Sequence, residues 1–151
     1  MLGGWETNGI VILESGPPFS VLSGRDNSQS GVNRDRADLV GEPTLDPGRA
    51  RAALIAEYFN KAAFANNAVG TFGNSGRNIL RGPGFASVDF GLLKNVALGG
   101  GHRVQFRTEV FNLFNRVNLG NPVNSVSAPN FAQIISAGSP RVIQLALKYA
   151  F

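Results

Sequence analysis

The sequence predicts an all-β protein, built from antiparallel strands of a transmembrane β-barrel that are joined by long extracellular loops. The first observation is the composition: 19 residues are glycine and only 16% are charged, which is typical of turns and strands rather than of a helical bundle. The second is that no run of about 18 apolar residues occurs, which excludes a transmembrane helix but not barrel strands. The third is the strict alternation of residues 141–151, in which one strand face carries only Ile143, Leu145, Leu147, Tyr149 and Phe151.

A first strand is predicted over residues 5–23. It is rich in Ile and Val but is interrupted by Gly16-Pro17-Pro18, and proline is tolerated at bends, edges and turns rather than inside a sheet. The interruption predicts either one bent strand or two strands joined by a turn at residues 15–17. Neighbouring strands of a barrel run in alternating directions, and one bent strand gives this segment the direction that the later strands require. Two strands would also fit if the turn between them were periplasmic.

Residues 24–84 lose all periodicity and are rich in Asn, Asp, Ser, Gly and Arg, which predicts a long loop. Loops of this length are uncommon in compact domains and are typically functional or mobile. One short helix is predicted inside the loop over residues 47–59, with Asp46 as its N-cap and Pro47 in its first turn. A second polar loop is predicted over residues 115–140.

Two further strands are predicted over residues 85–95 and 102–114, with a glycine-rich turn at residues 96–101 between them. Each strand has an apolar and a polar face. Together with residues 141–151, the apolar faces predict lipid contact for Ile143, Leu145, Leu147, Val104, Phe106, Val110, Val88, Phe90 and Leu92. The polar faces predict contact with a water-filled lumen, where charges keep their hydration, for Asp89, Arg103, Gln105, Arg107, Glu109, Gln144 and Lys148.

The loop lengths predict the orientation of these strands, since bacterial barrels place short turns in the periplasm and long loops outside. The turn at residues 96–101 and Phe151 are therefore expected on the periplasmic side. Four strands cannot close a barrel, because about eight is the usual minimum, so the chain is expected to be the carboxy-terminal part of a longer protein. Residues 1–13 lack the basic and apolar regions of a signal peptide, which predicts that the true start lies upstream.

Several other classes of function are disfavoured by the residue content. The formal charge is +4, but the arginines never form a basic run, which argues against a nucleic-acid partner. The chain has no cysteine, so thiol catalysis and thiolate metal sites are excluded. The single histidine, His102, stands beside a glycine-rich turn without a nucleophile elbow, and a structural role is predicted for it. No enzyme activity and no cofactor are predicted.

The first loop contains one candidate metal site, formed by the acidic residues Asp35, Asp38, Glu42 and Asp46. Their spacing departs from that of a calcium-binding loop, and Arg34 and Arg36 stand among them. Local ion pairs are therefore predicted in place of a bound metal.

Several segments resemble, in order and nearly end to end, the carboxy-terminal strands of TonB-dependent outer-membrane receptors. The greatest likeness is to the Oar-like group, which carries a carboxypeptidase-regulatory-like amino-terminal domain. The most specific segments are GTFGNSGRN, RGPG, EVFNLFN at residues 109–115, and the terminal Phe151. The likeness covers almost the whole chain.

This resemblance implies a barrel of roughly 22 strands that surrounds a plug in the outer membrane and is energised through TonB. The parent protein would import, export or display an unknown ligand, and the fragment alone would not be competent. Phe151, Tyr149 and Leu147 would form the terminal signal that the barrel-assembly machinery recognises. TonB would act only through the plug and TonB box, which this chain lacks. The alternative, of a different class, is a soluble or secreted β-rich binding module whose apolar faces form a sandwich core.

Overall fold

The computed structural model describes residues 3–151, which divide into two compact units. The first, here called the sheet unit, contains the residues up to Glu14 together with Phe85–Asn118 and Gly138–Phe151. The second, here called the loop unit, contains Ser15–Gly84 and Leu119–Ala137. Each unit is therefore assembled from segments that lie far apart in the sequence.

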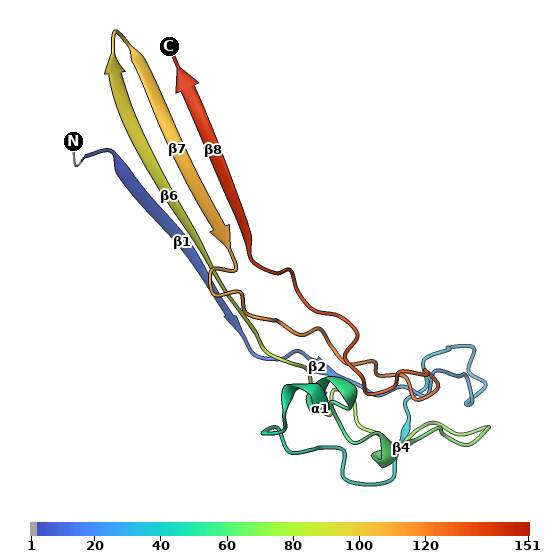
Figure 1. Cartoon of the computed structure of the whole chain (residues 1–151). Helices are drawn as coiled ribbons and strands as arrows, with labels where there is room; N and C mark the ends of the chain where they lie inside the picture. The colour runs from blue at the N-terminus through green and yellow to red at the C-terminus, as the bar shows by residue number, and fades with distance from the viewer. Residues whose placement is uncertain (1–2) are drawn as a thin grey trace. The chain divides into compact units, whose positions relative to one another are not determined.

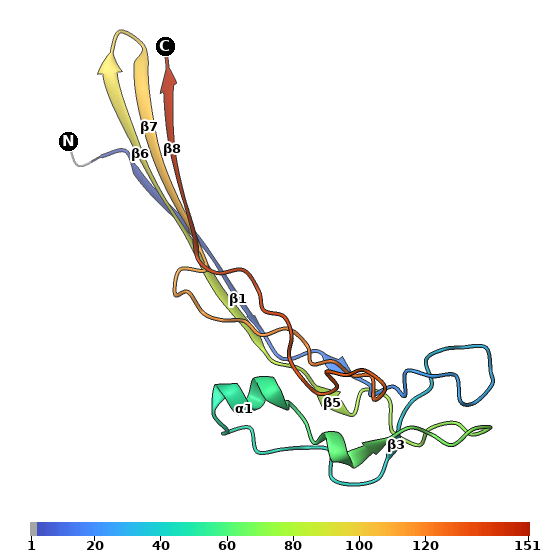
Figure 2. The ribbon, with the colours of Figure 1, turned by 45° about the vertical axis from the view of Figure 1, so that its right-hand side comes forward.

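The sheet unit is one antiparallel sheet of four strands (Figures 1 and 2). Its strands are β1 (Trp5–Glu14), β6 (Phe85–Gly99), β7 (His102–Phe111) and β8 (Val142–Ala150), which lie side by side in the order β1-β6-β7-β8. β1 and β8 are the two edges of this sheet. The arrangement confirms the predicted all-β class, in which antiparallel strands are accompanied by one short α-helix.

The β6–β7 hairpin is longer, and its turn tighter, than the sequence predicts. β6 continues past the predicted end at residue 95 to Gly99, because Val96 still pairs with Val104 of β7. The turn is reduced to Gly100 and Gly101, whose φ angles are 61° and 86°. These angles lie in the left-handed region, which glycine adopts without steric cost, so the glycines are what permit so tight a turn.

The ends of the other two carboxy-terminal strands also differ from prediction. β7 ends at Phe111 instead of residue 114, because Asn112 has a φ of 52° and turns the chain out of the sheet. The buried side chain of Asn112 holds this turn by donating hydrogen bonds to the carbonyl oxygens of Arg116 (2.9 Å) and Ser139 (3.2 Å). β8 lies within the predicted range of residues 141–151.

The single strand predicted over residues 5–23 is wrong. β1 ends at Glu14, and a separate short strand, β2 (Pro18–Phe19), pairs with β5 (Leu80–Arg81) in the loop unit. β2 therefore forms neither a continuation of β1 nor a hairpin with it. Gly16 lies between the two strands and is buried against a backbone carbonyl of the segment that follows β5, where a Cβ atom would collide. The close approach of two backbones requires glycine at this point.

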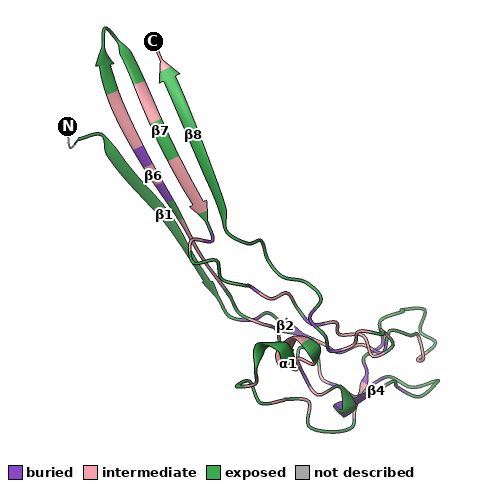
Figure 3. Cartoon of the chain, in the orientation of Figure 1, coloured by how far each residue is buried: buried purple, intermediate pink, exposed green. Residues whose placement is uncertain are grey.

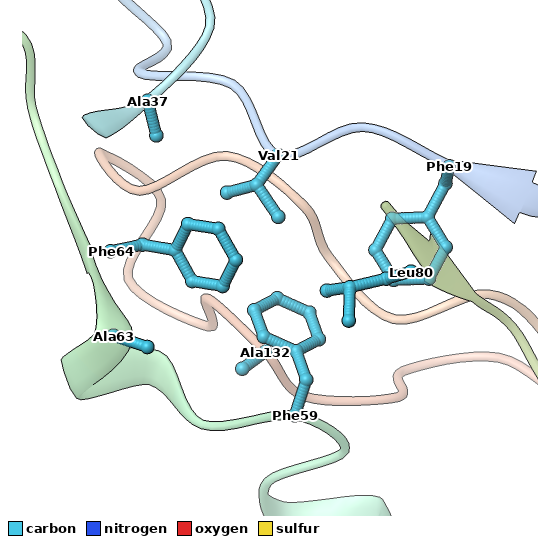
Figure 4. Packing of buried hydrophobic residues seen from close by; sticks show 8 residues of the cluster. All are labelled: Phe19, Val21, Ala37, Phe59, Ala63, Phe64, Leu80 and Ala132. Carbon is cyan, nitrogen blue, oxygen red and sulfur yellow. The ribbon is translucent and has the colours of Figure 1, made fainter. Parts of the chain in front are cut away.

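The two predicted loops form a packed unit. Its regular elements are short: besides β2 and β5 they are β3 (Asp38–Leu39), α1 (Arg51–Ala56), the 3-10 turn η1 (Lys61–Ala63) and β4 (Phe64–Ala65), which pairs with β3. The unit contains a hydrophobic cluster of Phe19, Val21, Ala37, Phe59, Ala63, Phe64, Leu80 and Ala132 (Figure 4). The cluster draws one or a few residues from each of several separate stretches, so it produces no periodic pattern in the sequence.

Phe59 is a central residue of this cluster. Its ring centroid lies 5.8 Å from that of Phe19, 5.6 Å from that of Phe64 and 5.3 Å from that of Phe131. The last two rings meet it edge-on, an arrangement that adds attraction between rings beyond the burial of their surface. The aromatic group therefore joins segments of both predicted loops into one core.

The helix α1 is shorter than the predicted range of residues 47–59, and its N-cap is different. It begins at Arg51, and Ala50 occupies the N-cap position without a side-chain hydrogen bond. Asp46 is not the cap, because its carboxylate accepts a hydrogen bond from the amide of Gly48 (2.8 Å) in a local turn before the helix.

The strands of the sheet unit are poorly buried. β1 and β8 are exposed along nearly their whole length, and β6 contains the few buried positions of the strands (Figure 3). Within residues 3–151, no helix combines the length and the apolar character needed to cross a membrane.

Candidate functional site

The candidate functional site is the sheet itself, whose two faces carry different chemistry. Val110 of β7 lies opposite Ile143 of β8, and Phe106 lies opposite Leu147. Phe90 of β6 lies opposite Val110 on the other side. Because directly opposed residues of an antiparallel pair point to the same face, all nine residues predicted to contact lipid lie on one face. We call it the apolar face.

The apolar face is uncovered in the described chain. Leu145 is 74% exposed, Leu147 is 67% exposed and Phe106 is 53% exposed. Large contiguous apolar surfaces of this kind are rare on proteins that are surrounded by water. The register thus groups these side chains on one face, and their contact with lipid stays a prediction.

β1 adds residues to the apolar face that the sequence analysis did not assign. The register with β6 places on this face Trp5, Val11 and Leu13. The alternation of β1 is hard to see in the sequence because Ile10 and Ile12, which are also apolar, point to the opposite face. Glu6 and Glu14 also point to that opposite face. Their charges are the signal in the sequence that could have identified the apolar positions of β1.

Lys94 is the one charged residue of the strands on the apolar face in the described chain. It lies opposite Trp5, and its Nζ sits 4.7 Å from the centroid of the Trp5 ring. The same Nζ donates a hydrogen bond to the carbonyl oxygen of Gly3 (2.6 Å). The ammonium group is therefore held by an aromatic face and a backbone oxygen, while its aliphatic stem lies along the apolar face.

The opposite face, here called the polar face, contains all seven residues predicted to face a lumen: Asp89, Arg103, Gln105, Arg107, Glu109, Gln144 and Lys148. Hydrogen bonds connect this face across three strands. Gln105 donates to the side-chain oxygen of Asn95 (2.8 Å), and the Asn95 amide donates to the carboxylate of Glu6 (2.9 Å). Arg107 and Glu109 form an ion pair at 3.8 Å, which is partly exposed and so adds little stability.

One end of the polar face is apolar, which the sequence analysis missed. This is the far end of the sheet, away from the β6–β7 hairpin, and it carries Ile10, Ile12, Phe85, Phe111 and Val142. Phe111 and Val142 are paired with each other, and they stand two residues from Glu109 and Gln144, so they point to the same face of the sheet. This two-residue spacing could have revealed the patch from the sequence, once the polar face had been assigned.

The hairpin end of the sheet carries an aromatic group. The hydroxyl of Tyr149 lies 2.8 Å from Nδ1 of His102, and the two rings are stacked with centroids 5.8 Å apart. The Phe151 ring lies 5.9 Å from that of Tyr149. His102 thus joins β7 to β8, and the assembly signal predicted for Phe151, Tyr149 and Leu147 stays a prediction.

The acidic residues of the loop unit do not form the predicted local ion pairs. Among the described residues, only Arg107 and Glu109 are paired in this way. Asp35 is buried and accepts hydrogen bonds from the amide (2.7 Å) and hydroxyl (2.7 Å) of Ser28 and from the side chain of Asn67 (3.2 Å). These bonds, the Ser28 amide first, lower the pKa of Asp35. Residues 3–151 contain no group of three or more His, Asp or Glu side chains placed to hold a metal ion.

Comparison with known proteins identifies the family. No curated protein and no solved structure matches the chain. The profile of one family does match, described as an outer membrane beta barrel domain, and it covers residues 1–144. This match extends over β1, β6, β7, the whole loop unit and the start of β8. It favours a barrel in the outer membrane over the alternative of a soluble binding module. The chain belongs to the outer membrane beta barrel domain family, and its sheet is part of an outer-membrane β-barrel.

Proposed function

We propose that this chain supplies the carboxy-terminal strands of a TonB-dependent transporter of the Oar-like group. In this role it is a structural wall of the channel through which the parent protein moves a large or scarce ligand. The observation that carries the proposal is the contrast between the two faces of the sheet. A charged, hydrogen-bonded polar face needs water, whereas an uncovered apolar face needs hydrocarbon, and a barrel wall around an aqueous lumen meets both needs.

The finer assignment to this group of transporters is supported by the segments GTFGNSGRN and EVFNLFN, which resemble those of the group. Both segments lie in parts of the chain with defined structure. EVFNLFN includes the end of β7 and the turn held by Asn112, and GTFGNSGRN includes Gly73, which is packed against the backbone of Arg36 and Ala37, just before β3. The resemblance therefore extends over both units.

The partners proposed for this wall follow from its surfaces. Outer-membrane lipid would contact the apolar face. Further strands of the parent barrel would pair with the two edges, β1 and β8, because unpaired backbone groups are costly in a membrane. The barrel-assembly machinery would bind the terminal aromatic residues, and TonB would act through other regions of the parent. The proposed role is structural, with no catalytic step.

The facing of the sheet is tested with cysteine variants of the full-length protein, in a background freed of other cysteines. Gln144 and Leu145 are neighbours in β8 that point to opposite faces. In outer-membrane vesicles, a water-soluble thiol reagent is expected to label Gln144→Cys and to leave Leu145→Cys unlabelled. Equal labelling of the two variants would contradict the proposed wall.

The assignment to TonB-dependent transport is tested in the coding DNA upstream of the codon for Met1. An open reading frame that encodes a plug, a TonB box and further alternating strands is expected. An in-frame stop codon directly upstream would contradict the transporter assignment, while leaving membership of the barrel family unchanged.

A further inference from the structure

The apolar patch at the far end of the polar face borders a groove within the sheet unit. The groove has a volume of about 440 Å³, which lies in the range of roughly 300–1,000 Å³ that is usual for small-ligand sites. Phe85, Phe111, Pro140 and Val142 form its apolar lining, and Asp89 also lines the groove. Exposed apolar side chains are unexpected on a face that otherwise carries hydrogen-bonded and charged groups, so this end of the face differs in kind from the rest.

Asp89 is fixed in position but is only partly satisfied. Its Oδ1 accepts a hydrogen bond from the hydroxyl of Ser87 (3.2 Å) and another from the backbone amide of Asn112 (2.9 Å). Among the described residues, nothing donates a hydrogen bond to its Oδ2, and no Lys or Arg forms an ion pair with it. A carboxylate that is oriented by one oxygen and open at the other can accept a charged donor from outside the chain.

The other polar side chains of the groove are largely occupied. Asn118 accepts a hydrogen bond from the amide of Ala86 (3.0 Å) and donates one to its carbonyl oxygen (2.9 Å). The side chain of Asn112 bonds to the backbone amide and carbonyl of Arg116 and to the carbonyl oxygen of Ser139. Asp89 and the exposed hydroxyl of Ser139 are thus the side-chain groups that remain open. A carbohydrate would leave most of its hydroxyls without a partner in this groove.

We propose that this groove binds a small amphipathic organic cation. Its protonated amine would donate to Oδ2 of Asp89, and its apolar body would lie against Phe85 and Phe111. The charges of the polar face agree with this choice. Glu109 lies diagonally across from Asp89 and is paired with Arg107, whereas the basic residues Arg103 and Lys148 lie toward the hairpin end. The inference rests on the proposed function, because it assumes that the polar face lines the lumen, and it names a ligand class for that lumen.

The test uses the full-length protein in lipid nanodiscs and 2-phenylethylammonium as the probe, with binding measured by calorimetry. The neutral 2-phenylethanol has nearly the same shape and serves as the matched ligand. Binding of the ammonium is expected to be at least roughly tenfold tighter than that of the alcohol, since only the ammonium forms a charge-assisted hydrogen bond. Equal affinities of the two compounds would overturn the proposal.

Two variants locate the site. Asp89→Asn is expected to weaken ammonium binding at least roughly tenfold. Glu6→Gln removes a carboxylate from the same face near the hairpin end and is expected to leave binding unchanged. Equal affinities of the two variants would overturn the proposal. If Asp89→Asn does not assemble, Phe111→Ala is the second test, because it removes one wall of the groove and should weaken both ligands.

A labelling experiment separates failure of this inference from failure of the proposed function. Ser87→Cys and Val88→Cys are neighbours on β6 that point to the polar and the apolar face. Labelling of Ser87→Cys alone by a water-soluble reagent, combined with no preference for the ammonium, would overturn the ligand site and leave the channel wall intact. Labelling of Val88→Cys alone would instead overturn the proposed wall.

Discussion

The two units of the chain place their apolar side chains in opposite ways. In the loop unit, Val21 is fully buried and Phe59 is only 2% exposed, because they pack in a common cluster. In the sheet unit, Leu93 is the one large apolar side chain that is buried among the described residues, and Leu145 is 74% exposed. The loop unit therefore has a buried apolar core, whereas every large apolar side chain of the sheet unit other than Leu93 is at least partly exposed among the described residues.

The two units are suited to different surroundings. The loop unit follows the rule for proteins in water, in which apolar surface is removed from the solvent. The sheet belongs to an outer-membrane barrel, where the strands pair their backbone groups with each other and an apolar outer face meets hydrocarbon. The two units should consequently be sensitive to different kinds of substitution.

The largest expected effect is in the core of the loop unit. Phe59→Ala should destabilise this unit by about 3–5 kcal/mol, because it opens a cavity between rings that pack against Phe59 from several segments. The measurement is the rate at which protease cleaves the loop unit of the full-length protein in membranes. Phe72→Ala is the control, since Phe72 is 73% exposed and its loss should change little. Similar cleavage of both variants would contradict a packed loop unit.

The next largest effect is expected on the apolar face of the sheet. Leu145→Arg should cost about 2–4 kcal/mol near the bilayer midplane, because it places a charge on the face proposed to meet lipid. Gln144→Arg, one residue away on the polar face, should be nearly silent. The measurement is denaturant-dependent folding of the full-length barrel into lipid vesicles. A cost for Gln144→Arg as large as that for Leu145→Arg would refute the assignment of the faces.

A third prediction concerns the buried carboxylate of the loop unit. The pKa of Asp35 is lowered from its ordinary value of 3.8, so its carboxylate stabilises the folded unit above that value. This contribution is lost as the pH falls through the lowered pKa. Cleavage of the loop unit by pepsin should therefore increase as the pH drops from about 4 to about 2, and Asp35→Asn should reduce this pH dependence.

Ser28→Ala refines the same measurement. It removes the hydroxyl donor to Asp35 but keeps the backbone amide, which is the larger cause of the lowered pKa. An intermediate pH dependence is expected. If all three proteins showed the same pH profile, Asp35 would have no part in the acid response of the loop unit.

The smallest effect is expected at the hairpin end of the sheet. Tyr149→Phe removes the hydroxyl that bonds to Nδ1 of His102 but keeps the stacked ring. It should cost about 0.5–1 kcal/mol in the same vesicle-folding measurement, since one exposed hydrogen bond is lost. A cost as large as that of Leu145→Arg would mean that this contact, and not the apolar face, dominates the stability of β8.

The sequence predicts the sheet better than the loop unit. The faces of β7 and β8 follow from alternation, which each short segment carries in its own residues. The core of the loop unit is different, because Val21, Phe59 and Ala132 come together from distant segments that have no common period. The sequence shows an interruption at Gly16 but not its consequence, because the partner of β2 is β5 and the backbone that packs against Gly16 is also far away in the sequence.

The alternation of the strands, the two kinds of face and the presence of a glycine-rich turn between β6 and β7 can be predicted from the sequence alone, because each depends on neighbouring residues. Three features become visible only in the folded structure: β1 pairs with β6, Asp89 lies in a groove lined by Phe85 and Phe111, and the two polar loops share one aromatic core. These features depend on contacts between residues that are distant in the chain. No local pattern specifies which distant segments will meet, since that choice follows from the packing of the whole fold.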